Sequence, residues 1–393
     1  MAPSKRKIFF LFNHDAPHQV AHLAGIVRAM TIERPDLDTR VAVGTPAIAA
    51  RLREILGDSV SASVAWIDLA LPRWMEATLS LPNRLAPIKR IMRLDHHAAL
   101  LGEADTLVSA ERTCLRLLRK WPAGHPTRIV HVPHGAGDRA VTYHPAMHDF
   151  DLMLVSGLKA ARELLVREII RSDRVRIIGY PKFDTVNLDA RPRLFDNDNP
   201  VFLYNPHFDP LLSSWYDEGP KLLDWFASPE GQSFNVIFAP HIMLFRKAIH
   251  VSPEYRMVRR RPDIRPHWRA APNILIDVDG PHLVDMTYTL AADGYIGDVS
   301  SQIYEFLVRP RPAFFFDRFS QDPRSKEGDL PFWQTGDVVT GANELPALIA
   351  NHVERGAHFR KAQKAIFAET FSLDKSHTAS SRAAAAIAEF YPL

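Results

Sequence analysis

Histidine side chains follow two of the predicted buried strands. His134 comes just after a strand predicted at residues 128–132, and His241 follows a strand predicted at residues 235–238. A histidine suits acid–base work near neutral pH, because its ordinary pKa lies close to that range. Gly135 follows His134 directly and allows a ligand to approach the backbone closely. The pattern predicts His134 as a general base. The alternatives are that His134 only hydrogen-bonds its own loop and that His241 only caps the end of its strand.

A third segment places an acid and two hydroxyls where a strand gives way to a helix. Asp298, Ser300 and Ser301 follow a strand predicted at residues 294–296 and open a helix predicted to run through Phe306. Such residues are typical caps of a helix start. A helix start with hydroxyls and exposed amides is also suited to hold phosphate. Both interpretations remain open from the residues alone.

Two further clusters have the composition of a metal site but not a complete ligand set. Asp277 and Asp279 follow a strand predicted at residues 274–276, and His18 and His22 are one helical turn apart. Carboxylates in a turn more often cap it, and zinc needs a third protein ligand, which is not evident here. We therefore predict no metal site.

The elements that must position these residues alternate between strands and helices. The strands are mostly continuous apolar runs, as expected of strands buried on both faces. Strand–helix alternation predicts parallel sheets joined by right-handed crossovers. The remaining strands are predicted at residues 8–12, 39–43, 152–155, 175–178, 201–204 and 313–316, and helices at residues 19–30, 46–55, 158–171 and 220–227.

A polar segment at residues 187–200 has the composition of a linker and divides the chain. We expect an α/β protein with two Rossmann-like doubly wound domains facing a cleft. The predicted domains are residues 1–186 and residues 200–374, followed by a C-terminal helix at residues 375–393. Ligands of such sheets bind beyond the carboxyl ends of the strands. Asn13 and His14, at the exit of the first strand, are therefore expected to line the cleft.

Composition excludes several classes of protein. The 393 residues are 46% hydrophobic with a net charge of +3, which is ordinary for a globular protein and too small a basic excess for a nucleic-acid binder. Cys114 is the single cysteine, so an intrachain disulfide is impossible. The sequence lacks a run of about 18 apolar residues, which a spanning helix needs. We expect a soluble cytoplasmic protein that is at most peripheral to a membrane.

Two basic stretches offer contacts to anions. Residues 81–93 contain Arg84, Lys89, Arg90 and Arg93 and no acid, which fits either weak docking on an anionic membrane or a solvated helix face. Residues 256–269 contain six arginines and one acid, Asp263. This second stretch suits a phosphate or polyanionic ligand, or an exposed loop.

The order of the motifs resembles that of the CDP-glycerol and CDP-ribitol polyol-phosphate transferases of teichoic-acid and capsule assembly, which have a GT-B-type fold. The similarity covers residues 125–385. The segments that resemble the family's signatures are His134-Gly135-Ala136-Gly137-Asp138-Arg139, Gly179-Tyr180-Pro181-Lys182-Phe183-Asp184, Asn205-Pro206-His207-Phe208, Pro240-His241, Gly297-Asp298-Val299-Ser300-Ser301 and Ser376-His377-Thr378-Ala379-Ser380-Ser381-Arg382.

The resemblance implies that a polyol phosphate moves from a CDP-activated donor to a hydroxyl of a glycan or lipid-linked acceptor. His134 would take the proton of that hydroxyl, and His241 would offset charge on the pyrophosphate. No cofactor is implied, and a divalent metal is possible but not required. The resemblance places the acceptor side in residues 1–186 and the nucleotide donor in residues 200–374. The implied donor-binding residues are Gly135, Pro206, His207, Asp298, Ser300, Ser301, Ser380 and Arg382, with Asn13, His14 and Arg139 on the acceptor side.

The sequence departs from the family where Ala136 to Arg139 stand in place of Thr-Pro-Leu-Lys and where Phe208 replaces a tryptophan. The acceptor and the donor can therefore differ. A nucleotide-sugar glycosyltransferase or a UDP-sugar 2-epimerase on the same architecture is the alternative enzyme. The third hypothesis is a non-enzymatic assembly factor that only binds a nucleotide.

Overall fold

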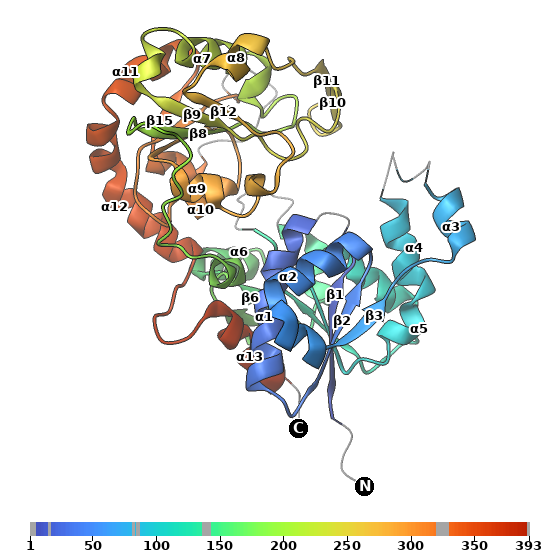
Figure 1. Cartoon of the computed structure of the whole chain (residues 1–393). Helices are drawn as coiled ribbons and strands as arrows, with labels where there is room; N and C mark the ends of the chain where they lie inside the picture. The colour runs from blue at the N-terminus through green and yellow to red at the C-terminus, as the bar shows by residue number, and fades with distance from the viewer. Residues whose placement is uncertain are drawn as a thin grey trace. The chain divides into compact units, whose positions relative to one another are not determined.

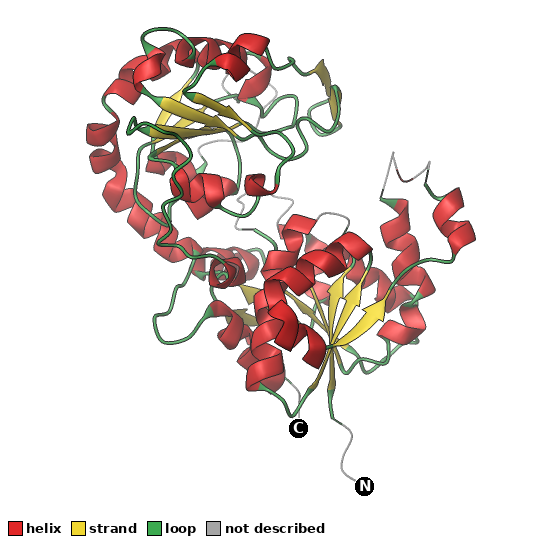
Figure 2. Cartoon of the chain, viewed as in Figure 1, coloured by secondary structure: helices red, strands yellow, loops and turns green. Residues whose placement is uncertain are grey.

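The computed structural model describes residues 5–14, 17–80, 83, 87–135, 143–319 and 330–390. The chain forms two compact units (Figure 1). Unit 1 comprises Met1–Val186 together with Ala368–Leu393, and unit 2 comprises Asn187–Phe367. Each unit consists of a central sheet covered by helices (Figure 2).

Unit 1 is built on a seven-stranded sheet in which all pairs of neighbouring strands are parallel. The strand order is β3-β2-β1-β4-β5-β6-β7, which is the Rossmann order with one strand added. The order reverses between β1 and β4. The strands are β1 (Lys7–Phe12), β2 (Asp38–Val43), β3 (Ala65–Asp68), β4 (Thr106–Ser109), β5 (Arg128–His131), β6 (Leu152–Val155) and β7 (Val175–Ile177).

Alternate side chains of β1 pack on opposite faces of this sheet. Ile8, Phe10 and Phe12 are in one apolar cluster, with α1 (Ala21–Glu33), α2 (Pro46–Ser63) and α13 (Ala379–Glu389). Phe9 and Leu11 are in the second cluster. Helices α3 (Arg73–Thr78), α4 (Ile88–His96), α5 (Ala98–Leu101) and α6 (Leu158–Val166) complete the unit. Because β1 is covered on both faces, its sequence from Ile8 to Phe12 is a continuous apolar run.

Unit 2 repeats the same order in a six-stranded parallel sheet, β12-β9-β8-β13-β14-β15, which reverses between β8 and β13. The strands are β8 (Val201–Asn205), β9 (Asn235–Phe238), β12 (Ile274–Ile276), β13 (Gly294–Gly297), β14 (Ala313–Phe316) and β15 (Asp337–Val339). The helices are α7 (Gly219–Phe226), α8 (Pro266–Ala270), α9 (Thr287–Ala291), α10 (Gln302–Phe306), α11 (Leu345–Ala350) and α12 (His352–Thr370). A separate antiparallel ribbon is formed by β10 (Ile249–Ser252) and β11 (Met257–Arg260).

The predicted α/β class with two doubly wound parallel sheets is confirmed. Every strand predicted from an apolar run is present within a residue or two of its expected bounds. One helix is shorter than predicted: α6 ends at Val166 instead of residue 171, because Glu168 adopts a left-handed backbone with φ 52°.

The division of the chain differs at its C-terminal side from the predicted one. The predicted donor domain ran to residue 374 and was followed by a separate helix. In the structure the chain returns to unit 1 at Ala368. Helix α13 packs on α1, so that Ala383, Ala384 and Ile387 belong to the core of unit 1.

Candidate functional site

The carboxyl ends of β8 and β13 meet where the strand order of unit 2 reverses. Asp298 directly follows β13 and ties the two strand ends together. Its Oδ2 accepts hydrogen bonds from the backbone N of His207, at 2.8 Å, and of Ser214, at 2.9 Å. This carboxylate therefore fixes the loop that follows β8, which contains the predicted donor-binding residues Pro206 and His207.

Asp298 is buried, with 1% of its surface exposed, and burial raises the pKa of its carboxyl to about 6. Hydrogen bonds from Ser214 and His207 and the charge of Arg318 act in the opposite direction. Its Oδ1 has no hydrogen-bond partner within the described part of the chain. Because its Oδ2 faces two backbone amides inside the loop, we assign Asp298 a positioning role. Direct contact of Asp298 with a donor stays a prediction.

The two histidines of this edge carry their protons on the same ring nitrogen. The Nδ1 of His207 accepts a hydrogen bond from the backbone N of Asp209 at 3.0 Å, and the Nδ1 of His241 accepts one from Met243 at 3.2 Å. In the neutral ring the proton must then be on Nε2, which is a donor. The ring centres of His207 and His241 are 5.4 Å apart. Donors of this kind suit oxygen atoms of a phosphate.

Arg318 is a component of this edge that the sequence analysis did not select. It follows β14, the neighbour of β13, and its exposed fraction is 5%. Its Nη2 pairs with Asp217, while Nε and Nη1 have no hydrogen-bond partner in the described residues. A buried guanidinium with unused N–H donors is suited to an anion. The signal in the sequence was a charged residue just beyond the apolar run of β14.

Ser300 makes a capping contact at the start of α10, whereas Ser301, the N-cap residue, makes no side-chain cap hydrogen bond within the described residues. The Oγ of Ser300 accepts a hydrogen bond from the backbone N of Gln302 at 3.3 Å, which satisfies a free amide at the start of α10. Helix α10 is only five residues long, so its dipole is small. Their contact with a donor stays a prediction.

In unit 1, His134 lies near the corresponding reversal, between β1 and β4. It follows β5, the neighbour of β4, and its Nδ1 donates a hydrogen bond to the carbonyl oxygen of Ala110 at 2.8 Å. A carbonyl only accepts, so Nδ1 carries the proton and Nε2 is the acceptor in the neutral ring. Gly135 has φ 113°, which favours glycine at this position. His134 thus has the proton arrangement that a general base requires.

The predicted acceptor-side residues Asn13 and His14 are buried at the end of β1. Asn13 and His14 are both 2% exposed. The Nδ2 of Asn13 donates a hydrogen bond to the carbonyl oxygen of Arg90 at 2.9 Å, so this side chain joins β1 to α4. Long-range packing thus covers both side chains, and their place on the acceptor side stays a prediction. Arg139 lies outside the described residues.

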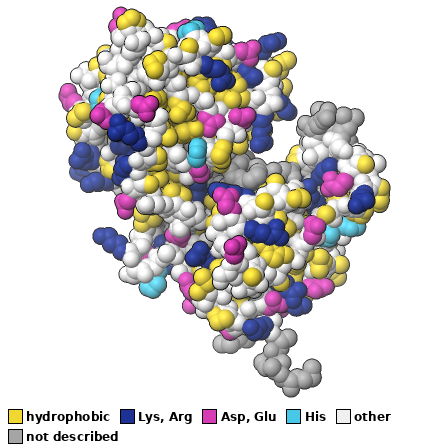
Figure 3. Space-filling model, in the orientation of Figure 1, with side chains coloured by type: hydrophobic (Ala, Val, Ile, Leu, Met, Phe, Trp, Pro, Cys, Tyr) yellow, Lys and Arg dark blue, Asp and Glu magenta, His cyan; other side chains and the backbone are white. Residues whose placement is uncertain are grey.

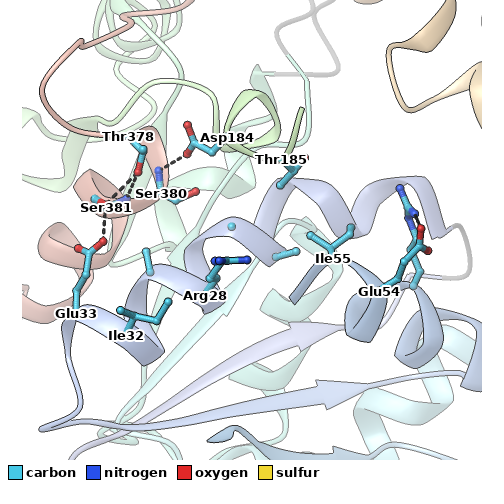
Figure 4. A pocket seen from close by; sticks show the side chains of 14 residues that line it. Arg28, Ile32, Glu33, Glu54, Ile55, Asp184, Thr185, Thr378, Ser380 and Ser381 are labelled. Carbon is cyan, nitrogen blue, oxygen red and sulfur yellow. Dashed lines mark hydrogen bonds and ion pairs between the residues drawn. The ribbon is translucent and has the colours of Figure 1, made fainter. Parts of the chain in front are cut away.

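Ser380 and Arg382, predicted to bind the donor, belong to unit 1 and not to the unit of the donor-side strands. Nη2 of Arg382 donates a hydrogen bond to the carbonyl oxygen of Ser372 at 2.6 Å. Ser380 lines a groove of about 700 Å³ between α1, α2, η7 (Pro181–Thr185) and α13, in which Arg28 and Asp184 also lie (Figure 4). The structure therefore places both residues in the packing of α13.

The other clusters considered for metals have structural roles or lie outside the described residues. Asp277 accepts hydrogen bonds from the backbone N of Asp279 and Gly280 and from the hydroxyl of Tyr288. The side chain of His18 is outside the described residues. Within the described ranges, no group of three or more His, Cys, Asp or Glu side chains could hold a metal ion.

No protein-family model and no curated protein matches the sequence. Solved structures do match, and they share its α/β arrangement over nearly the whole chain. The wall teichoic acid polymerase TagF is 16% identical, with 98% of this chain and 89% of that chain covered and a TM-score of 0.58. TagF has also been solved with CDPG, and that structure gives a TM-score of 0.61 at 17% identity, covering 98% of this chain and 88% of that chain.

Two further solved structures are similar to the same extent. A putative UDP-N-acetylglucosamine 2-epimerase from Listeria monocytogenes is 12% identical, with 98% and 96% of the two chains covered and a TM-score of 0.62. The S. aureus MnaA–UDP co-structure is 14% identical, with 97% and 96% covered and a TM-score of 0.59. At these identities the comparisons establish the GT-B-like fold that the sequence motifs implied.

Proposed function

We propose that the protein is a transferase that moves a polyol phosphate from a CDP-activated donor to a hydroxyl of a glycan or lipid-linked acceptor. The observation that carries the proposal is the opposite proton placement in two histidines at strand ends. His134 has its acceptor at Nε2, as a base requires, and His241 has its proton there, as a phosphate contact requires. The shared fold with TagF, solved with CDPG, supports the choice of donor.

In the proposed reaction, Nε2 of His134 takes the proton of the acceptor hydroxyl. The acceptor oxygen forms a bond to the β-phosphorus, and the bond from that phosphorus to the bridging oxygen breaks. The electron pair leaves with CMP. The Nε2–H groups of His241 and His207 offset the charge that grows on the pyrophosphate oxygens. Arg318 adds a fixed positive charge at the same sheet edge.

The proposal includes independence from a divalent metal, because histidine and guanidinium N–H groups offset the leaving-group charge in its place. Turnover should then persist after treatment with a chelator. A loss of turnover that added Mg²⁺ or Mn²⁺ restores would contradict this part of the proposal.

A UDP-sugar 2-epimerase is the second candidate, favoured by the near-complete coverage of the epimerase structures and by the MnaA complex with UDP. Calorimetry with CDP, UDP and GDP separates the two, because the proposal requires CDP to bind most tightly. Turnover is measured as release of CMP from CDP-glycerol in the presence of a hydroxyl acceptor. Preference for UDP with interconversion of UDP-N-acetylglucosamine would favour the epimerase. Nucleotide binding without any turnover would favour an assembly factor.

A further inference from the structure

The β10–β11 ribbon of unit 2 has two faces of different character. Its strands pair antiparallel, with Val251 opposite Val258 and Ile249 opposite Arg260, and they do not join the six-stranded sheet. A two-stranded ribbon is marginally stable alone and needs support on one face. The supporting face contains His250, Ser252 and Arg259.

Polar contacts hold that supporting face against the unit. The Nε2 of His250 donates to the carbonyl oxygen of Leu244 at 2.8 Å. Arg259 forms a two-bond pair with Asp217, at 2.8 and 2.5 Å, and its guanidinium lies 4.8 Å from the ring centre of Tyr216. The ribbon is therefore fixed in orientation, and its other face must point to solvent.

The outward face is apolar. Ile249, Val251 and Val258 are 54%, 61% and 64% exposed. Single exposed apolar residues are ordinary, but here three β-branched side chains stand together on one face of a strand pair. An exposed ribbon edge of this kind also favours unwanted pairing, which cations on the ribbon oppose.

The cations around this face lack partners of opposite charge in the part of the chain that the structure describes. Arg246, Lys247, Arg256 and Arg260 are exposed, and none forms an ion pair within the described residues. Between residues 246 and 260 the sequence has one acid, Glu254. Figure 3 shows Lys and Arg side chains beside apolar ones along the edge of unit 2 where Figure 1 labels the ribbon. The face thus combines apolar side chains with a net positive charge.

The stretch at residues 81–93, expected to dock on a membrane, differs from this ribbon. Lys89 pairs with Glu76 at 2.5 Å and Arg90 with Glu111 at 2.7 Å, while Arg93 is buried. Arg84 lies outside the described residues. Lys89 and Arg90 of that stretch thus have acidic partners within unit 1, and membrane docking by residues 81–93 stays a prediction.

We propose that the outward face of the β10–β11 ribbon docks the protein on an anionic phospholipid surface. The valine and isoleucine side chains enter the boundary between headgroups and acyl chains, and the four cations lie at the level of the lipid phosphates. No helix in the described ranges is long and apolar enough to cross a membrane. The inference does not rest on the proposed function, because vesicle binding requires no turnover.

The test is co-sedimentation of the full chain with vesicles of phosphatidylcholine, with and without phosphatidylglycerol. Binding should require phosphatidylglycerol and weaken as salt rises past about 0.15 M. The variants Val251→Ser/Val258→Ser and Arg256→Gln/Arg260→Gln should each lose about tenfold or more in binding. Val353→Ser and Arg360→Gln/Lys361→Gln, exposed positions on α12, are the matched controls and should bind as the wild type does.

Equal binding to both kinds of vesicle would overturn the proposal, as would wild-type binding by both ribbon variants. Absence of vesicle binding by the wild type would overturn it as well. A dimer, seen by light scattering and abolished by Val251→Ser/Val258→Ser, would assign the face to self-association instead. Circular dichroism and the thermal midpoint of each variant show whether the fold is kept.

Discussion

The carboxylate of Asp184 accepts a hydrogen bond from the backbone N of Ser380 at 2.7 Å, across 196 positions of sequence. Both residues come from motifs that resemble family signatures. Arg382, from the second motif, lies against Gly179, from the first. The ring centres of Tyr180 and Phe371 are 4.7 Å apart, which adds an aromatic contact between the same two parts of the chain. These two motifs therefore connect α13 to unit 1, and a motif match at Ser380 and Arg382 is explained by packing.

Replacing Asp184 by Ala should destabilise unit 1, because the backbone N of Ser380 in the first turn of α13 loses its acceptor, while Thr378 remains as the N-cap. We expect a loss of about 1–2 kcal/mol in the free energy of unfolding, measured by urea titration. Asp189→Ala, in the linker, is the control and should change stability by less than about 0.5 kcal/mol. Equal losses of unfolding free energy in the two variants would show that the hydrogen bond between Asp184 and Ser380 does not stabilise unit 1.

His134→Ala should reduce turnover by roughly 10²–10⁴-fold, since a general base is lost. Binding of the donor nucleotide should stay within about threefold, because the base acts on the acceptor. Single-turnover kinetics and calorimetry measure the two quantities. His148→Ala, at an exposed position of the same unit, is the control. If the His134 variant keeps more than about a tenth of the wild-type rate, the base is another group.

Arg318→Gln should weaken the binding of a nucleoside diphosphate by about tenfold or more, because charge-assisted hydrogen bonds to a phosphate are lost. Calorimetry with CDP measures the change. Arg259→Gln is the matched control, since Arg259 pairs with the same partner, Asp217, from the ribbon. An equal loss of affinity in both variants would assign Arg318 a structural role through Asp217.

The raised pKa of Asp298, about 6 against an ordinary value of 3.8, predicts a pH dependence of stability. The folded protein holds this proton at pH values where the unfolded chain has released it. Stability from this group is therefore greatest below about pH 4 and is lost as pH rises to about 6. The loss is at most about 3 kcal/mol.

Asp298→Asn removes this titration while keeping an oxygen for the two amides. We expect the unfolding free energy of the variant to fall less than that of the wild type between about pH 4 and pH 6. Parallel curves for the two proteins, from urea unfolding at several pH values, would contradict the raised pKa.

Continuous apolar runs made most strands predictable, and the strands that were missed lack that signal. β3 has exposed residues at both ends, β4 begins with Thr106 and ends with Ser109, and β15 has three residues. The β10–β11 ribbon alternates buried and exposed positions over only four residues per strand. Such short segments resemble loops in sequence, and pairing within the fold decides their structure.

The candidate site was predictable where local sequence determines position. His134 and His241 could be found because they follow apolar strands. Arg318 was missed because nothing local shows that Asp217, about a hundred positions away, partners it. The hydrogen bond from Asn13 to Arg90, 77 positions away, is equally invisible in a local pattern.

The return of the chain to unit 1 at its C-terminal side sets an order on folding during synthesis. Residues 187–367 leave the ribosome before α13 is made, so unit 2 can close its sheet first. Unit 1 must wait with the flank of α1 uncovered, because Ala383, Ala384 and Ile387 cover it only at the end. Unit 1 is thus the first unit to be translated and the last to complete its fold. Until α13 is made, unit 1 exposes an apolar surface of the kind that chaperones bind.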